Sequence, residues 1–335
     1  MNNILVVNIN WLGDAVFSTP VFKALKKAYP HARLSCLCVP RVKEVLQYCP
    51  YIDRIIVYDE RGKHRWPWAK WSLIQYLRKE RFDMAFLLHR SMTRALFVFL
   101  AGVPLRIGYS KYKSLLTHPV DIQSEDVHRC DYYLKILEDY GIKVQDRVCE
   151  LRYSLEDMQS LDAKLIKSGI SLNDKYVVLN TGGNWDLKRW NMVSFIHLAQ
   201  RLNQLYGFKI VLPGSPKDKE NCQRIAQAAE IGVVDLSGKT TLGESLALYK
   251  RAVAVISADS GPLHLADSVG ADVIGIFGPT RPEITGPRGR GRAQILFKDV
   301  GCNKAPCYHL ACTHNVCMQS VTVEDVCQAF KRLKP

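Results

Sequence analysis

Short apolar, β-branched runs of strand length alternate with longer segments of helical period along this chain, and the alternation runs through twice. The pattern is typical of parallel sheets that are covered by helices. A chain of 335 residues is also longer than one hydrophobic core usually supports. We therefore predict two doubly wound α/β domains, at residues 1–165 and 166–335. The strands that we expect begin at Asn3, Arg33, Arg54, Asp83 and Leu105, and again at Lys175, Lys209, Gly232, Ala254 and Asp272.

The composition is that of a soluble globular protein, with 47% apolar and 23% charged residues. The longest apolar runs, such as residues 95–103, fall short of the roughly 20 residues that a membrane span needs. The N-terminus passes directly into ILVV without a basic leader, so we expect a cytoplasmic protein whose eleven cysteines stay mostly reduced.

Positive charge is concentrated in the first part of the chain. The first 120 residues hold 19 Lys and Arg against 7 Asp and Glu, whereas the remaining residues hold 27 against 25. This asymmetry predicts an anionic partner for the first domain, such as a nucleic acid, a phosphorylated lipid or a membrane surface. A solvated basic surface is the alternative.

The segment SADSGPLHLADSVGA, residues 257–271, runs from an expected strand into an expected helix. Gly261 and Pro262 suit the start of that helix, whose backbone N–H groups and partial positive charge favour a phosphate. Asp259 and Ser260 would lie beside the anion. The alternative is that one of them caps the helix.

The segment NTGGNWDLKRW, residues 180–190, follows another expected strand and predicts a second phosphate contact. Thr181, Gly182 and Gly183 offer hydroxyl and backbone donors, and Lys188 and Arg189 offer charge for a diphosphate. A solvated Lys-Arg pair is the alternative. The chain lacks the G-x-G-x-x-G and G-x-x-x-x-G-K-[ST] patterns, which argues against dinucleotide redox chemistry and P-loop hydrolysis.

Asp14 follows the first expected strand, where a carboxylate can act as a general base on a hydroxyl within hydrogen-bond reach. The alternative is that Asp14 caps a helix.

The tail carries Cys302, Cys307, Cys312 and Cys317 at intervals of five, with His309 and His314 between them. Four thiols could hold a structural zinc or iron ion, although the spacing lacks the usual C-x2-4-C pairs, and reduced packed cysteines are the alternative. The nearby segment GPRGRGR, residues 286–292, is interpreted as a loop and not as a nucleic-acid contact.

Three segments occur in an order that resembles one enzyme family: NINWLGDAVFSTPVFKALK, then NTGGNWDLKRW, then SADSGPLHLADSVGADVIGIFGPT. Over essentially its whole length the chain resembles the bacterial lipopolysaccharide heptosyltransferases of the ninth glycosyltransferase family. The KRW motif and the cysteine tail look more like the second heptosyltransferase than the first. The resemblance implies the GT-B fold, with two Rossmann-like domains facing across a cleft. The N-terminal domain would bind the acceptor and the C-terminal domain the ADP-heptose donor, with a C-terminal helix that could cross back.

The resemblance also implies roles for individual residues. Asp14 would be the catalytic base, and Lys188 would neutralise the departing diphosphate. The donor-binding residues that it implies are Thr181, Gly182, Glu220, Asp259, Ser260, Gly261 and His264. The segment KTTL, residues 239–242, would lie near the adenine.

The activity that the resemblance implies is an inverting transfer of heptose from ADP-L-glycero-D-manno-heptose to the inner-core oligosaccharide of lipopolysaccharide. It needs one carboxylate, no cofactor and no catalytic metal. The alternatives are a GT-B enzyme that uses another nucleotide sugar and a non-catalytic nucleotide- or RNA-binding protein.

The partners that the resemblance implies are ADP-heptose, a phosphorylated lipid A-core acceptor and the anionic inner-membrane surface, with no nucleic acid. The location would be cytoplasmic and peripheral, at the inner face of that membrane. The residues expected to contact the acceptor and lipid headgroups are Arg61, Lys63, Arg65 and Lys70, interleaved with Trp66, Trp68 and Trp71. A partly exposed helix and loop is the alternative.

Overall fold

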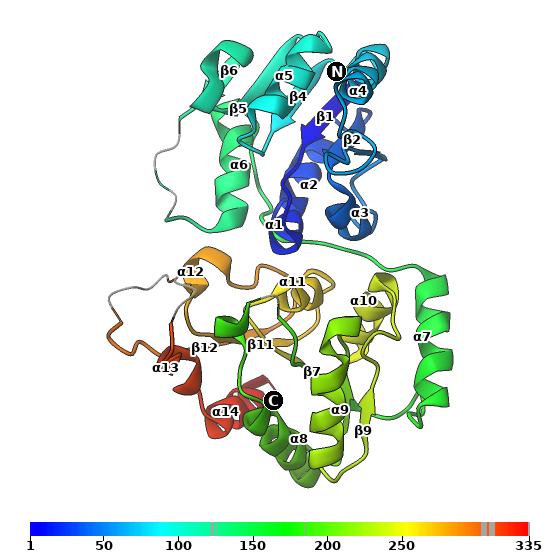
Figure 1. The fold of residues 1–335 in the computed structure, drawn as a ribbon, viewed down its shortest axis with the longest axis vertical. Helices are drawn as coiled ribbons and strands as arrows, with labels where there is room; N and C mark the ends of the chain where they lie inside the picture. The colour runs from blue at the N-terminus through cyan, green and yellow to red at the C-terminus, as the bar shows by residue number, and fades with distance from the viewer. Residues whose placement is uncertain (122–123, 125, 184, 303–306, 308–311, 334–335) are drawn as a thin grey trace. The chain divides into compact units, whose positions relative to one another are not determined.

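The computed structural model describes residues 1–121, 124, 126–183, 185–302, 307 and 312–333. The chain divides into two compact units, Met1–Leu151 and Arg152–Pro335, each built around its own sheet (Figure 1). The prediction of two α/β domains is confirmed. The division falls after Leu151, however, and not after residue 165.

The first unit is a sheet of six parallel strands in the order β3-β2-β1-β4-β5-β6. Its strands are β1 (Asn3–Val7), β2 (Arg33–Cys38), β3 (Arg54–Val57), β4 (Met84–Leu87), β5 (Leu105–Tyr109) and β6 (His118–Val120). The α-helices that join and cover them are α1 (Leu12–Phe17), α2 (Thr19–Ala28), α3 (Pro40–Leu46), α4 (Pro67–Lys79), α5 (Met92–Leu100) and α6 (Arg129–Asp139).

The second unit repeats this topology with the strand order β12-β11-β10-β7-β8-β9, again all parallel. Its strands are β7 (Tyr176–Asn180), β8 (Lys209–Leu212), β9 (Val233–Asp235), β10 (Val255–Ala258), β11 (Val273–Phe277) and β12 (Ala293–Phe297). Its α-helices are α7 (Leu155–Lys167), α8 (Met192–Tyr206), α9 (Lys219–Ala228), α10 (Leu242–Arg251), α11 (Gly261–Ser268), α12 (Pro282–Thr285), α13 (Val316–Gln319) and α14 (Val323–Leu333).

Both units have the strand order of Rossmann-like domains, so the predicted fold class is confirmed. The sequence pattern missed one edge strand in each sheet. Strand β6 has only three residues and contains Pro119, which lacks the N–H that a strand pattern assumes. Strand β12 is half exposed, so it lacks the continuous apolar run of a buried parallel strand.

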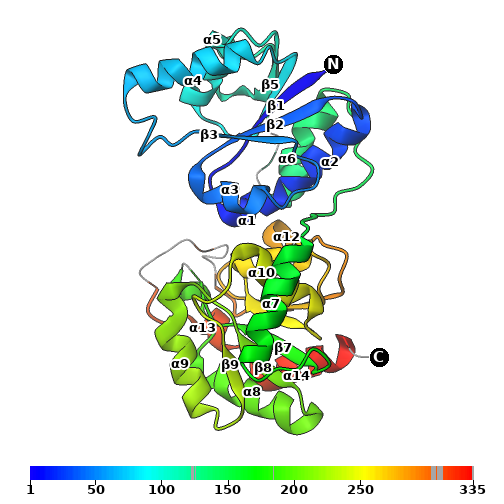
Figure 2. The ribbon, with the colours of Figure 1, turned by 90° about the vertical axis from the view of Figure 1, so that its right-hand side faces the viewer.

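Helix α7 explains why the division between the units lies earlier than predicted. It packs along α10 within the second unit (Figure 2). Lys164 on α7 lies 2.6 Å from Glu244 on α10, and Asp162 pairs with Arg251. A boundary at residue 165 would have cut this helix.

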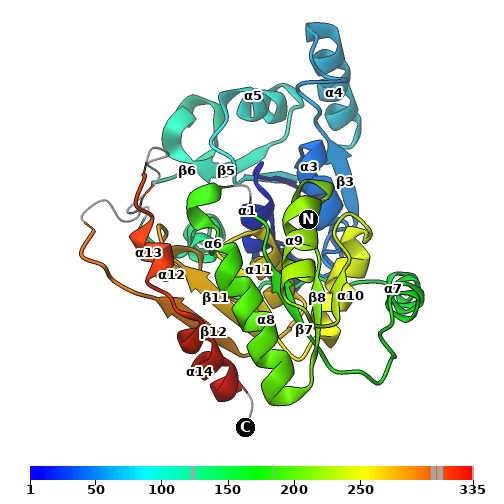
Figure 3. The same ribbon diagram turned by 60° about the horizontal axis from the view of Figure 1, so that its bottom comes forward.

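The C-terminal helix α14 stays with the second unit, contrary to the idea that it crosses back. It lies beside α8 and strand β12 (Figures 1 and 3). Phe330 is 1% exposed and contacts the rings of Tyr206 and Phe208. The apolar face of α14 is therefore buried in the core of the second unit.

The strand order reverses between β1 and β4 in the first sheet and between β7 and β10 in the second. Ligands of doubly wound sheets bind at such switch points, outside the carboxyl ends of the strands. Val7 pairs with Leu87, and Asn180 pairs with Ser257, so the segments that follow each pair leave the sheet at the same edge. A ligand site is therefore expected at these two edges.

Among the residues that the structure describes, no helix is both long enough and apolar enough to cross a membrane.

The segment 286–292 is a loop, as predicted, and its glycines have a packing role. A Cβ atom at Gly289 would overlap the backbone carbonyl of Asp267, and one at Gly291 would overlap that of Ala271. The loop therefore packs directly against the end of α11 before it enters β12.

We expect the substitution Gly291→Ala to lower the free energy of unfolding by about 1–3 kcal/mol, because the added methyl group must displace the backbone of residue 271. Gly232→Ala is the matched control, since a Cβ at Gly232 meets open space. Urea unfolding followed by circular dichroism measures both. Equal stabilities of the two variants would contradict the packing role.

Candidate functional site

A pocket opens at the switch point of the second sheet, where β7 and β10 end. Its lining residues come from the end of β10 and from the segments that follow the two strands: Gly182, Gly183, Trp185, Lys188, Ala258, Asp259, Ser260 and Gly261. The two segments that the sequence singled out as phosphate contacts therefore form one pocket.

An ion pair between Lys188 and Asp259 lies in this pocket. Lys188 Nζ is 2.6 Å from Asp259 Oδ2, and the Asp259 side chain is only 3% exposed. Two threonine hydroxyls also donate to Oδ2, from Thr280 at 2.6 Å and from Thr285 at 3.3 Å. The buried carboxylate is thus surrounded by donors.

His264 is a second partner of the Asp259 carboxylate. Its Nε2 is 3.2 Å from Asp259 Oδ1, and its side chain is buried. Burial alone would raise the pKa of Asp259, but the hydrogen bond and charge of His264, followed by those of Lys188, hold it well below the ordinary range of an aspartate. Asp259 is therefore an anion that compensates the Lys188 charge.

Helix α11 begins at Gly261, directly beside this ion pair. Ser260 occupies the N-cap position but makes no side-chain capping bond, and Asp259 instead binds the side chains described above. The capping alternative for these two residues is wrong. The first turn of α11 therefore directs its backbone N–H groups and positive dipole end toward the pocket.

The glycine loop after β7 approaches its neighbours closely. A Cβ atom at Gly182 would lie 2.8 Å from the carboxyl group of Asp218, so a larger residue would have to displace that side chain. Thr181 is buried, with its hydroxyl 3.5 Å from the Cys222 thiol. Arg189 donates two hydrogen bonds to the carbonyl of Gly183, so it supports the loop. We expected Arg189 to offer charge to a diphosphate, but it is not among the residues that line the pocket.

Two other segments assigned to the donor are not brought to this pocket. Glu220 lies in the first turn of α9, where its side chain is 75% exposed and pairs with Arg224. In the segment 239–242, Thr241 forms a capping box with Glu244 at the start of α10. The assignments of Glu220 and of this segment to the donor stay predictions.

Asp14 lies in the first turn of α1, near the switch point of the first sheet. Trp11, not Asp14, occupies the N-cap position, so the capping alternative is wrong here too. The carboxylate Oδ1 accepts a hydrogen bond from the Tyr133 hydroxyl at 3.0 Å. Asp14 is half-buried, which leaves part of its side chain accessible.

The same edge of the first sheet holds a buried cation that the sequence analysis missed. Arg94 on α5 is 3% exposed and donates to the carbonyl of Asn8 at 3.0 Å and to Asn10 Oδ1 at 2.7 Å. His89, directly after β4, has a pKa lowered to about 4 by burial and by the charge of Arg94. Arg94 thus orders the loop between β1 and Asp14.

The basic and aromatic segment lies at the start of α4. Arg61, Lys63 and Arg65 are exposed, as are Trp66, Trp68 and Trp71, at 52%, 67% and 51%. The rings of Trp66 and Trp68 stack at 5.2 Å, and the Arg65 guanidinium lies over Trp66. These residues therefore form an exposed surface of indole rings and cations, which we call the tryptophan surface.

The four tail cysteines line a separate pocket in the second unit, together with Leu187, Gly278 and Pro279. Cys302 and Cys312 are exposed, and Cys307 and Cys317 are half-buried. In the described part of the chain, no three His, Cys, Asp or Glu side chains are placed to hold a metal ion. His309 lies outside the described residues. The metal site stays a prediction, which the metal content of the purified protein and its melting temperature with a chelator would test.

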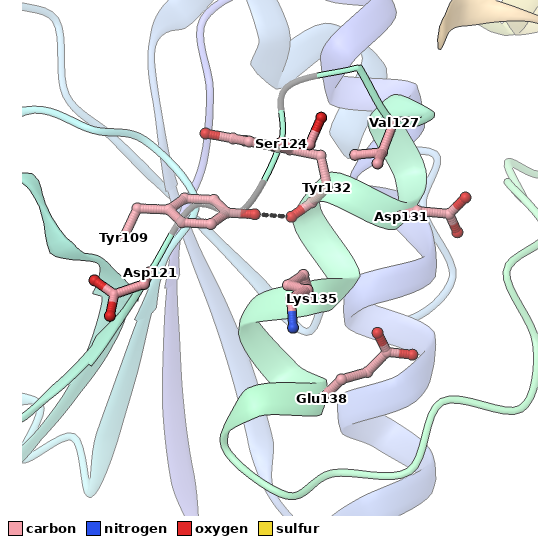
Figure 4. Close-up of a pocket in the computed structure, with 8 residues that line it drawn as sticks. All are labelled: Tyr109, Asp121, Ser124, Val127, Asp131, Tyr132, Lys135 and Glu138. Atoms are coloured by element: carbon pink, nitrogen blue, oxygen red, sulfur yellow. Dashed lines mark hydrogen bonds between the residues drawn. The ribbon is translucent and has the colours of Figure 1, made fainter. Parts of the chain in front are cut away.

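A further pocket in the first unit lies between α6, the end of β5 and the segment after β6 (Figure 4). The Tyr109 hydroxyl donates to the backbone carbonyl of Tyr132, and their rings stack at 4.5 Å. The carboxylates at its edge are largely engaged, since Asp131 and Glu138 pair with Arg147. This pocket contains none of the residues predicted for a site.

The sequence therefore found the two loops of the second-unit pocket but not all of their partners. Thr280 lies in FGPTRPE, which follows β11, and its position at a strand end could have indicated it. Tyr133 and Arg94 lie on helices, where no motif distinguishes them.

The chain is similar to known proteins over most of its length. Residues 70–316 match the family model described as glycosyltransferase family 9 (heptosyltransferase). The chain is 26% identical over 319 residues to lipopolysaccharide heptosyltransferase 2 of Escherichia coli K12, covering 90% of this chain and 89% of that protein.

Two solved structures are similar over 99% of this chain. A family 9 glycosyl transferase from Veillonella parvula has a TM-score of 0.87 at 24% identity, with 97% of that chain covered. The E. coli ADP-heptose heptosyltransferase II has a TM-score of 0.81 at 22% identity, with 98% covered. At these identities the two structures establish the fold.

We expect Asp259→Asn to lower the free energy of unfolding of the second unit by about 3 kcal/mol near neutral pH, because Lys188 loses a buried partner. The native pKa of Asp259 lies below its unfolded value of about 3.9, so its stabilisation is present above that pH and is lost as the pH falls. The stabilities of wild type and variant should therefore converge as the solution is acidified.

Urea unfolding from about pH 7 down to about pH 2 measures this convergence, because the stabilisation is lost below the unfolded pKa of about 3.9. Glu220→Gln is the control, since its exposed pair with Arg224 should contribute less than about 1 kcal/mol. A variant as stable as wild type at neutral pH would show that the ion pair does not hold the pocket.

Proposed function

The chain belongs to glycosyltransferase family 9, and we propose that it transfers heptose with inversion from ADP-L-glycero-D-manno-heptose to the inner-core oligosaccharide of lipopolysaccharide. The observation that carries the proposal is the pocket at the second switch point, where Lys188 and the start of α11 meet. The similarity to heptosyltransferase 2 supports the choice of donor and acceptor.

The second-unit pocket suits the diphosphate of the donor. Lys188 supplies a cation, and the first turn of α11 with the glycine loop supplies backbone N–H groups. Asp259 offsets the charge of Lys188 before the donor binds. As the bond to the sugar breaks, negative charge grows on the departing diphosphate and attracts Lys188 more strongly, which lowers the barrier.

Asp14 of the first unit is proposed as the general base. In an inverting displacement the acceptor hydroxyl attacks the anomeric carbon while ADP leaves from the opposite face, and the hydroxyl proton passes to the base. A diphosphate leaves without protonation, so one carboxylate is enough. Asp14 is half-buried and accepts a hydrogen bond from the Tyr133 hydroxyl, whereas Asp259 is buried with its pKa held low and is a poor base.

The tryptophan surface is proposed to contact the anionic inner-membrane surface, where a phosphorylated lipid A-core acceptor would lie. Indole rings favour the interface of a bilayer, and Arg61, Lys63 and Arg65 add charge that anionic headgroups attract. A cytoplasmic, peripheral location follows from this proposal.

Mass spectrometry of truncated lipopolysaccharide after incubation with ADP-heptose and the protein tests the function. We expect the acceptor to gain the mass of one heptose. An unchanged acceptor, together with stronger thermal stabilisation by UDP or GDP than by ADP, would instead favour an enzyme that uses another nucleotide sugar.

Two substitutions separate the proposed base from the donor site. Asp14→Asn should reduce kcat by about 10²–10⁴-fold and leave ADP-heptose affinity unchanged. Lys188→Ala should weaken both donor binding and kcat, because the charge acts before and during departure of ADP. Lys167→Ala, at an exposed lysine on α7, is the charge-matched control. Near-normal turnover of Asp14→Asn would refute its assignment as base.

Co-sedimentation with vesicles tests the tryptophan surface. The protein should bind anionic vesicles more than neutral ones, and a Trp66→Ala, Trp68→Ala double variant should lose this binding while it keeps its fold. Equal binding to neutral and anionic vesicles would argue against the proposed membrane contact.

A further inference from the structure

Tyr133 is a buried tyrosine of α6 whose hydroxyl contacts Asp14. Its side chain is 6% exposed, and the two oxygens are 3.0 Å apart. An ionised carboxylate can only accept hydrogen bonds, so the tyrosine must be the donor. The hydroxyl therefore stabilises the charged form of the side chain that the proposed reaction uses as its base.

Helix α1, which carries Asp14, depends on its neighbours for its position. It has only six residues and no side-chain cap at Trp11, so its intrinsic stability is low. Helix α6 packs against it at two places. The His128 ring meets the Phe17 ring edge-on at 5.4 Å, and one turn further along Tyr133 meets Asp14.

We propose that Tyr133 is a positioning residue for sugar transfer: its hydroxyl holds the Asp14 carboxylate in one orientation and keeps it ionised to accept the proton of the acceptor hydroxyl. This inference rests on the proposed function. It adds to the proposed base, Asp14, a second residue that positions it.

The donor keeps its proton at ordinary pH. Burial, followed by the charge of Asp14, raises the pKa of Tyr133 well above its usual value, so the phenol does not ionise where the enzyme works. The hydrogen bond is therefore present whenever Asp14 is charged.

Other ionisable groups lie on the helices that pack against α1. Arg129 and Tyr132 on α6 act on Tyr133 with opposite sign. Arg41 on α3 lies over the Trp11 ring, and Lys43 and Glu44 of the same helix are exposed. Lys23 on α2 is paired with Asp146 and Glu150. Tyr133→Phe retains all of these groups, so a change in its pH dependence relative to wild type reports on the Tyr133 hydroxyl.

Tyr132 provides a matched control on the same helix. It faces the pocket of Figure 4, where it stacks on Tyr109, and its hydroxyl accepts from Arg90 at 3.4 Å. Tyr132→Phe thus removes a buried hydroxyl from α6 without removing the bond to Asp14.

The test compares Tyr133→Phe with Tyr132→Phe in the heptose-transfer assay across pH. We expect Tyr133→Phe to reduce kcat by about 10- to 100-fold and to leave the KM for ADP-heptose unchanged. The acid limb of its kcat profile should move up by about one pH unit, because the carboxylate loses a donor that favours its charged form. A residue that only supports the fold would not move that limb.

A second readout does not require turnover. The stability difference between wild type and Tyr133→Phe should be largest near neutral pH and should narrow at acid pH, as Asp14 becomes protonated. The inference would be overturned if the acid limb of the kcat profile were the same for Tyr133→Phe and Tyr132→Phe. It would also be overturned if the stability difference between wild type and Tyr133→Phe did not change with pH. A wild-type protein that transfers no heptose would overturn the proposed function, and the stability series would still decide whether the contact exists.

Discussion

The ion pair between Lys188 and Asp259 organises the second unit at the edge where its ligand would bind. A carboxylate that is 3% exposed is costly to bury unless donors surround it. Here the donors come from three separate stretches of chain: Lys188 from the loop after β7, His264 from α11, and Thr280 and Thr285 from the segment after β11. The Asp259 carboxylate therefore holds these stretches together.

The ion pair between Lys188 and Asp259 also explains why Asp259 and Asp14 have different proposed roles. The charge of Asp259 is compensated by a cation and by several hydrogen bonds that hold its pKa low. It is therefore a weak base, and its role is to hold the side chains around it in place. Asp14 is half-buried and receives a hydrogen bond from the neutral hydroxyl of Tyr133. Under the proposed function, the first unit supplies proton acceptance and the second supplies charge for the leaving group. The two sheets have the same strand order, so the difference arises from the side chains at their edges.

Much of this could be predicted from sequence because it depends on local patterns. Alternating apolar runs predicted ten of the strands, and small and charged residues after β7 and β10 predicted the pocket. The edge strands β6 and β12 were missed because one is short and contains Pro119, and the other is half exposed. The assignment of Glu220 to the donor came only from resemblance and stays a prediction, since the side chain lies exposed on α9, outside the lining of the pocket. Tyr133 and Arg94 could not be found, since their partners lie more than 80 residues away in sequence.

A crystal structure of the protein with ADP would test the central claim most directly. We predict that the diphosphate lies in the second-unit pocket, against Lys188 and the first turn of α11, with Asp259 still buried behind it. ADP bound in the first unit, or a diphosphate that makes no contact with Lys188, would contradict the account.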